Sequence, residues 1–215
     1  MQISKTIVIN CAGMGARLGF GHTKALLEIG GKPLILHHLD QVSEFEDVRI
    51  VVGFDAPELI KTVLKYRKNV VFVFNHEYKS TGTLGSLVLG AQHAREYIVS
   101  IDGDLLVKTN DMKKFLSFND EVVGYCTTYS DDPVCVDISK ENQNYFATRF
   151  TRERGKYEWT GLVQIKKSAL KKGKEHVYHT LEDKLPIRAL KIDCREIDTP
   201  RDLIDAMRWA RKKIK

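Results

Sequence analysis

Short apolar runs alternate with amphipathic stretches through the first hundred residues. The runs are continuously apolar, which is typical of strands buried on both faces of a sheet. Strands are predicted at 6–11, 48–53, 70–74 and 97–101. Helices are predicted between them, at about 33–45, 56–67 and 84–95. This alternation predicts an α/β, Rossmann-like domain, with a mostly parallel central sheet and helices on both faces.

The pattern changes beyond Asp120. Short strands are predicted at 122–129, 134–138 and 145–151, with no long helix between them. They indicate a small antiparallel extension packed against the parallel sheet. A last strand is expected at 190–194, and Pro200 opens a final helix. Because no linker, repeat or low-complexity run separates the two patterns, residues 1–215 are predicted to form one domain.

Composition narrows the class of protein. The chain has 215 residues, of which 43% are hydrophobic and 29% charged, which excludes a disordered or fibrous protein. No apolar stretch reaches the ~18 residues of a membrane span, and the first run is too short for a secretory signal. The four cysteines are scattered without a C-x-x-C pair, so no zinc site is expected. Their pattern favours a reduced, cytoplasmic setting.

The net charge of +6 says little about partners. Part of it lies in residues 208–215, where cations at the end of the predicted helix complement the helix dipole. No aromatic interleaving or nucleic-acid motif accompanies the basic residues. Small anionic substrates are therefore expected, and neither nucleic acid nor a membrane is.

A glycine-rich turn follows the first strand and carries two cations, Arg17 and Lys24. Such a turn lets backbone N–H groups approach a phosphate chain, although it also serves as a plain tight connection. It is neither a dinucleotide fingerprint, since Leu18 stands at the third glycine position, nor a P-loop. With the two cations it predicts a triphosphate site. The expected nucleotide contacts in the turn are Ala12, Gly13, Met14, Gly15 and Ala16.

Carboxylates occur at two further places. Asp102 and Asp104 end the fourth predicted strand, where α/β sheets bind ligands and where an oxygen ligand can hold Mg²⁺, although such residues also cap helices. Near the C-terminus, Thr199 is a candidate N-cap and Asp202 suits the first turn of the helix. That assignment leaves Asp198 unexplained.

The segment 75–87 combines hydroxyls, glycines and a predicted helix start. Four of its residues are candidates for hydrogen bonds to a nucleotide base: Ser80, Gly82, Thr83 and Ser86. The alternative is an ordinary helix start capped by Thr81 or Thr83. No histidine is assigned to chemistry, because the seven histidines have no ligand spacing.

Gly13-Met14-Gly15-Ala16-Arg17-Leu18-Gly19, Thr23-Lys24-Ala25-Leu26 and Gly31-Lys32-Pro33-Leu34 together resemble the signature of the nucleotidyltransferases, the sugar-1-phosphate and phosphocholine NTP transferases with a glycosyltransferase-A-like fold. Cys11 replaces the usual alanine or glycine, and Thr23 the usual proline. The resemblance implies Mg²⁺ as cofactor, held by Asp104 and by Asp198 of an Asp-Thr-Pro element. Asp102 is then expected near the ribose. Residues 1–120 would bind the NTP, and 121–215 the acceptor and the second metal ligand.

The resemblance implies transfer of a nucleoside monophosphate to a phosphate or phosphonate acceptor, with Arg17 and Lys24 neutralising charge. The branch is open. Asn75-x-x-Tyr78 is similar to phosphocholine cytidylyltransferases, which favours CTP, whereas the Gly82-Thr83 pair is similar to sugar-phosphate enzymes. Glu158 and Trp159 are acceptor candidates, Trp159 being equally suited to the core. A homodimer is compatible with the sequence. A glycosyltransferase or a non-catalytic nucleotide-binding module are the alternatives.

Overall fold

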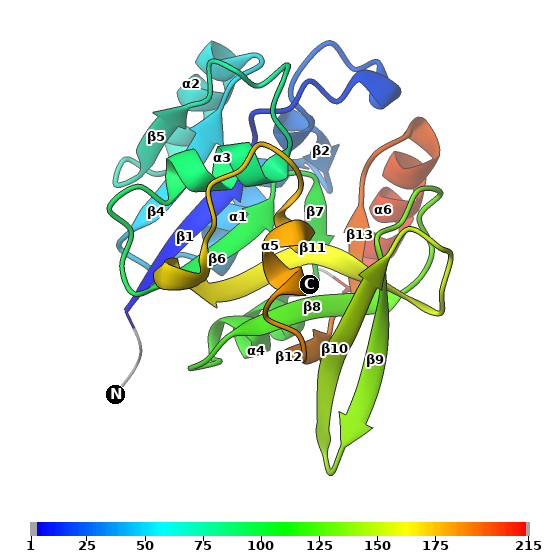
Figure 1. The fold of residues 1–215 in the computed structure, drawn as a ribbon. Coiled ribbons are helices and arrows are strands. Elements are labelled where there is room, and N and C mark those ends of the chain that lie inside the picture. The colour runs from blue at the N-terminus through cyan, green and yellow to red at the C-terminus, as the bar shows by residue number, and fades with distance from the viewer. Residues whose placement is uncertain (1–3, 214–215) are drawn as a thin grey trace.

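A nine-stranded mixed sheet forms the centre of the molecule, with strand order β5-β4-β1-β6-β11-β8-β12-β10-β9 (Figure 1). The computed structural model describes residues 4–213. The four predicted parallel strands are confirmed, and β1 lies between β4 and β6. They are β1 (Lys5–Asn10), β4 (Val48–Val52), β5 (Val71–Phe74) and β6 (Tyr97–Asp102).

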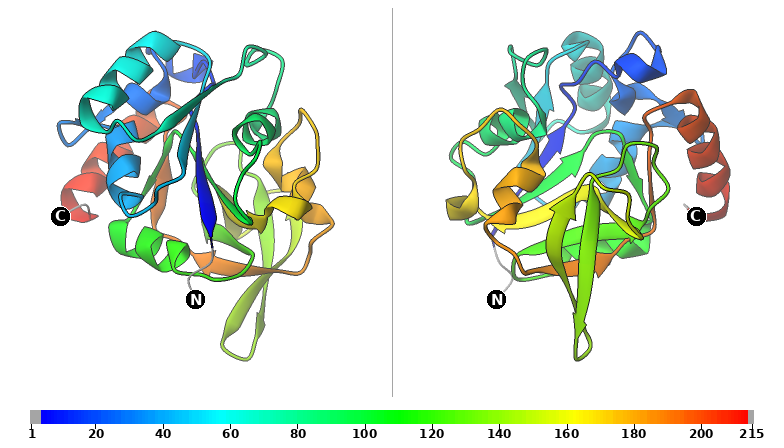
Figure 2. Two further views of the ribbon diagram at one scale, coloured as in Figure 1. Left: turned by 90° about the vertical axis from the view of Figure 1, so that its left-hand side faces the viewer. Right: turned by 45° about the vertical axis from the view of Figure 1, so that its right-hand side comes forward.

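The antiparallel strands extend this same sheet. β11 (Tyr157–Lys166), which the sequence pattern did not reveal, pairs antiparallel with β6 and joins the two halves. The prediction of an antiparallel extension is confirmed, but its placement against the sheet was wrong, because backbone hydrogen bonds join it edge to edge. The remaining strands are β8 (Val122–Thr127), β9 (Cys135–Glu141), β10 (Asn144–Thr151) and β12 (Ile187–Lys191). The β9–β10 hairpin projects beyond the body of the molecule (Figure 2).

The single strand predicted at 190–194 is two strands in different sheets. Two hydrogen bonds hold the chain after it leaves β12. The Ile192 N–H donates to the Tyr125 carbonyl, and the Asp193 carbonyl accepts from the Lys108 N–H. The chain then forms β13 (Cys194–Glu196), which pairs with β7 (Leu105–Val107). This crossing brings the segment after β13 beside the end of β6.

Helices cover both faces of the sheet, as predicted (Figure 2). Ile7 and Ile9 of β1 face one layer and Val8 the other, which explains why this strand is continuously apolar. One layer holds α1 (Leu34–Gln41), α2 (Ala56–Tyr66) and α4 (Thr109–Leu116). The other holds α3 (Thr83–Gly90) and α5 (Val177–Glu182).

α6 (Pro200–Lys213) stands apart from these layers, and Trp209 and Ala206 pack with Ile29 of the small β2–β3 hairpin (Glu28–Ile29 and Lys32–Pro33). Pro200 opens α6 as predicted, whereas Pro33 precedes α1 and does not lie in its first turn. α1 and α3 end earlier than predicted, and α4 and α5 were not predicted. No helix within residues 4–213 has the length and apolarity needed to cross a membrane.

His38 of α1 provides a test of this core. Its ring is buried, and burial together with neighbouring His37 lowers its pKa from 6.5 to about 4. The unfolded chain therefore binds the extra proton between these two pH values, so the free energy of unfolding should fall as the pH is lowered from 6.5 towards 4. Urea unfolding at pH 7.5 and 4.5 should show a smaller loss in His38→Gln than in the wild type. Equal losses would mean that His38 is not buried as the neutral form.

Candidate active site

The glycine-rich turn runs from the end of β1 across the carboxyl edge of the sheet. Gly15 and Gly19, with φ of 59° and 64°, flank the short 3-10 helix Ala16–Leu18. These left-handed conformations explain the two glycines. Thr23, at the position where proline is usual in the resembled family, donates its hydroxyl to the Cys11 carbonyl at 3.2 Å. The turn is thereby held against β1, and Lys24 follows immediately.

A cavity of about 480 Å³ opens beside this turn. Thirteen of the predicted site residues line it: Ala12, Gly13, Gly15, Ala16, Arg17, Lys24, Gly82, Thr83, Ser86, Asp102, Asp104, Trp159 and Asp198. Met14, Ser80 and Glu158 are not among its lining residues. Met14 is exposed to solvent, and the Ser80 hydroxyl donates to the Glu77 carbonyl at 3.2 Å.

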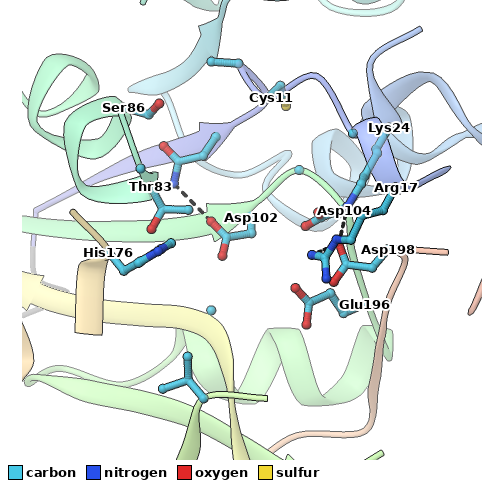
Figure 3. A pocket seen from close by; sticks show the side chains of 18 of the residues that line it. Cys11, Arg17, Lys24, Thr83, Ser86, Asp102, Asp104, His176, Glu196 and Asp198 are labelled. Atoms are coloured by element: carbon cyan, nitrogen blue, oxygen red, sulfur yellow. Dashed lines mark hydrogen bonds and ion pairs between the residues drawn. The ribbon is translucent and has the colours of Figure 1, made fainter. Parts of the chain in front are cut away.

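Lys24 links the two predicted metal ligands. Its Nζ lies 2.9 Å from Asp104 Oδ2 and also hydrogen-bonds Asp198 Oδ1, while Arg17 Nη2 lies 2.9 Å from the same Asp198 oxygen (Figure 3). Burial alone would lower the pKa of Lys24, but the two carboxylates outweigh it and hold the pKa above its ordinary value. Lys24 is therefore a cation at neutral pH. Asp198 is free for this role because Thr199 and Asp202 cap α6 between themselves.

Glu196 completes an acidic cluster that the sequence analysis missed. One carboxylate oxygen from each of Asp104, Glu196 and Asp198 lies within 4.8 Å of the others. Burial, and then the charges of Asp104 and Asp198, raise the pKa of Glu196 well above its ordinary value. The available signal was its spacing, since residues two apart in an extended segment share a side. Three hard oxygen donors suit Mg²⁺, so the donor set fits this cofactor.

Asp102 lies in the cavity between this cluster and Thr83 (Figure 3). It accepts a hydrogen bond from Asn10 Nδ2 at 3.4 Å, and burial followed by the charge of Asp104 raises its pKa to about 7. Gly161 makes room for it at a bulge in β11, because a Cβ there would lie 2.3 Å from Asp102 Oδ2. Asp102 is not part of the cluster of metal-ligand candidates, which consists of Asp104, Glu196 and Asp198.

The start of α3 is held by two sets of hydrogen bonds. Asn75 Nδ2 donates to the hydroxyls of Thr81 and Ser86 at 2.9 and 3.0 Å. The N–H groups of Gly82 and Leu84 are already bonded to the carbonyls of 174 and 175, so this helix start is covered by a neighbouring segment. Neither threonine caps the helix through its side chain; the N-cap is Gly82. The amides of Gly82 and Leu84 are therefore occupied, whereas Thr83 and Ser86 line the cavity.

Another part of the cavity lining is aromatic and polar, and the segment 176–178 lies beside the start of α3. Trp159 lines it and packs edge-on against Phe150 and Tyr178. The Arg152 guanidinium lies 5.7 Å from the Tyr178 ring centroid and pairs with Asp132 at 3.4 Å. Of these side chains, the sequence analysis named Trp159 as an acceptor candidate. It did not assign Tyr178, Asp132 or His176, because they come from separate segments of the chain.

Glu158 faces the opposite side of β11 from Trp159. Its buried carboxylate accepts the backbone N–H groups of Tyr129 and Ser130, each at 3.3 Å, and the Ser130 hydroxyl. The structure therefore places Glu158 behind the cavity wall. It holds the loop that brings Ser130 and Asp132 to the cavity.

Gly15→Val is expected to weaken nucleotide binding without destroying the fold. A Cβ at Gly15 would lie 2.8 Å from Lys24 Cγ, and the positive φ costs a branched residue about 1–3 kcal/mol. Calorimetry with CTP and Mg²⁺ should show a rise in Kd of roughly tenfold or more. Gly155→Ala, where the new Cβ meets only ordinary contacts, is the matched control. An unchanged Kd in Gly15→Val would show that the turn does not approach the nucleotide.

The fold is that of the nucleotidyltransferase class. Residues 7–155 match the MobA-like NTP transferase domain, and the chain belongs to that family. CTP:phosphocholine cytidylyltransferase from Streptococcus pneumoniae superposes with a TM-score of 0.78 at 20% identity, covering 96% of this chain and 99% of that one. The inositol-1-phosphate CTP transferase from T. maritima superposes with a TM-score of 0.76 at 19% identity, covering 99% and 98%. The predicted fold and family are thereby confirmed.

Relatives found by sequence similarity match a smaller share of this chain than the solved structures do. The bifunctional protein GlmU of Aliarcobacter butzleri is 31% identical over 113 residues, which are 52% of this chain and 26% of GlmU. GlmU of Solibacter usitatus is 35% identical over 109 residues, 49% of this chain and 22% of that protein. The matched segment is thus about a quarter of the length of these relatives.

Proposed function

We propose that the chain is an Mg²⁺-dependent nucleotidyltransferase that transfers CMP from CTP to a small phosphorylated acceptor and releases pyrophosphate. The observation that carries the proposal is the meeting of Lys24 and Arg17 with Asp104, Glu196 and Asp198 under a glycine-rich turn. An oxygen of the acceptor's phosphate forms a bond to the α-phosphorus. The bond from that phosphorus to the bridging oxygen breaks, and pyrophosphate leaves with the electron pair.

Asp104, Asp198 and Glu196 would hold the Mg²⁺, which when bound supplies positive charge to the phosphate oxygens. Lys24 and Arg17 lie beside these ligands, where they can neutralise charge on the triphosphate. No general base is required, since the acceptor oxygen is already anionic. The protein's contribution is positioning and charge neutralisation.

The lining of the cavity supports one orientation of the substrates. Its α3 end offers hydroxyl side chains, suited to a base, and Asp102 lies between that end and the acidic cluster, suited to the ribose. The aromatic part of the lining would receive the acceptor. Trp159 and Tyr178 suit a cationic or ring-shaped group, and Arg152 suits an anionic one. CTP and a phosphorylated alcohol or amine, such as phosphocholine or a phosphonate, fit this division, which also agrees with the names of the two structural neighbours.

A sugar 1-phosphate acceptor is the second candidate. The Gly82-Thr83 pair favours it, and a UDP-glucose pyrophosphorylase superposes with a TM-score of 0.78 at 18% identity. Aromatic side chains beside Asp and Arg are also suited to a sugar ring and its hydroxyls.

The test is a pyrophosphate-release screen with Mg²⁺. CTP, UTP, GTP and dTTP would each be combined with phosphocholine, phosphoethanolamine, 2-aminoethylphosphonate and several sugar 1-phosphates. Release with CTP and a non-sugar acceptor is expected, and it should be lost in Asp104→Asn. Release only with sugar 1-phosphates would favour the second candidate. Transfer only from a nucleotide sugar, without pyrophosphate, would identify a glycosyltransferase and contradict the proposal.

A further inference from the structure

The cations of the site are bonded to the carboxylates that would bind the metal. Lys24 Nζ bonds both Asp104 and Asp198, and Arg17 bonds Asp198. The Lys24 side chain is only 12% exposed, so this arrangement is enclosed and is not a loose surface pair. The groups proposed for the nucleotide and those proposed for the metal thus satisfy one another.

The ammonium group and a divalent cation compete for the same oxygens. The three candidate ligand oxygens lie within 4.8 Å of one another, and Mg²⁺ takes its oxygens at about 2.0–2.1 Å. Lys24 donates to two of these three carboxylates. A metal ion held by Asp104 and Asp198 would lie beside the Lys24 ammonium, and repulsion between the two cations favours withdrawal of Lys24.

Lys24 has a short path to the nucleotide. Its Cγ and Cε lie 2.8 and 3.2 Å from where a Gly15 Cβ would stand, so its stem runs along the glycine-rich turn. That turn is the surface expected to approach the phosphates. A change of rotamer at the end of the side chain would move the ammonium away from the carboxylates while the stem stays beside the turn.

We propose that Lys24 and Arg17 exchange partners when substrate binds, leaving Asp104 and Asp198 to the metal and taking phosphate oxygens of the nucleotide. The inference rests on the proposed metal and nucleotide site and is independent of the acceptor. In the free protein the carboxylates hold the cations that the nucleotide needs, and the cations hold the carboxylates that the metal needs. Each ligand therefore releases binding groups for the other, and their affinities are coupled.

The metal arm of the test uses Mn²⁺ alone, without nucleotide, measured by electron paramagnetic resonance. Lys24→Met keeps the stem and removes the competitor, so Mn²⁺ affinity should rise by roughly tenfold or more, the scale of a lost charge-assisted hydrogen bond. Arg17→Met, at a 59% exposed side chain with little risk to folding, should give a smaller rise. Lys174→Met removes a lysine paired with Glu77 away from the cluster and should change nothing. Unchanged or weaker Mn²⁺ binding in both Lys24→Met and Arg17→Met would overturn the inference.

The nucleotide arm uses CTP in excess EDTA, measured by calorimetry. Asp198→Asn removes the negative charge that pairs with both Lys24 and Arg17. Metal-free CTP should therefore bind the variant several-fold more tightly than it binds the wild type. Asp137→Asn removes a carboxylate that pairs with Arg149 outside the cavity, and it should have no comparable effect. Weaker or equal CTP binding in Asp198→Asn would overturn the exchange.

Both arms predict a gain of affinity on removing a site residue, and damage to the fold produces only losses. The outcome is also separable from the proposed function. Gains in both arms without pyrophosphate release from any NTP would leave the exchange standing and reject the transferase. Pyrophosphate release without either gain would reject the exchange alone.

Discussion

Replacing Asp104 or Asp198 by alanine is expected to remove most of the turnover while changing the melting temperature little. Both side chains face the cavity, and their charged partner Lys24 keeps one carboxylate when the other is removed. The loss should be seen in kcat at limiting and saturating Mg²⁺, alongside thermal unfolding of the same proteins.

Asp202→Ala is the matched control for Asp198→Ala. Asp202 lies four residues after Asp198. Its carboxylate accepts the Thr199 N–H at 2.8 Å and so helps to cap the start of α6. Its loss should cost about 0.5–2 kcal/mol of stability, with a much smaller effect on turnover. If Asp198→Ala instead keeps near-normal turnover at limiting Mg²⁺, that carboxylate belongs only to the start of the helix.

Lys24→Ala and Arg17→Ala are each expected to slow turnover by roughly 10²-fold or more, the scale for losing a preorganised charge aimed at a developing anion. Steady-state rates at saturating NTP measure the effect, with Lys174→Ala as the charge-matched control outside the cavity. For Lys24 the combination is distinctive, because metal affinity should rise while turnover falls. Should both variants keep the wild-type kcat/KM for the NTP, the glycine-rich turn does not hold the triphosphate and the proposed function loses its physical basis.

The position of Glu158 shows how the wall of the cavity at Trp159 is built. Its carboxylate lies behind β11 and binds the loop at Tyr129 and Ser130, while the next residue, Trp159, lies on the cavity side. Alternation along one strand thus places a loop anchor and a wall residue back to back. Acceptor selectivity in this chain would then depend on the loop as well as on Trp159.

The sequence alone determined the features that are encoded within a few neighbouring residues. A continuously apolar run such as 6–11 specifies a strand buried on both faces, and the structure places Ile7 and Val8 in opposite layers. A glycine-rich turn permits left-handed backbone, which the structure shows at Gly15 and Gly19, and the predicted N-cap at Thr199 is present together with Asp202. These are local preferences of the backbone, and distant segments do not alter them.

Only the tertiary structure decided which distant segments meet. β11 inserts between β6 and β8 although it follows β8 by some thirty residues, and this order sets Gly161 against Asp102. The crossing from β12 to β13 carries Glu196 to Asp104, a meeting that no spacing along the chain specifies. Strand order depends on the summed packing of both helical layers, whereas a sequence pattern reports only which face of each element is apolar. The residues that converge on the cavity from separate strands and loops were therefore beyond a reading of local pattern.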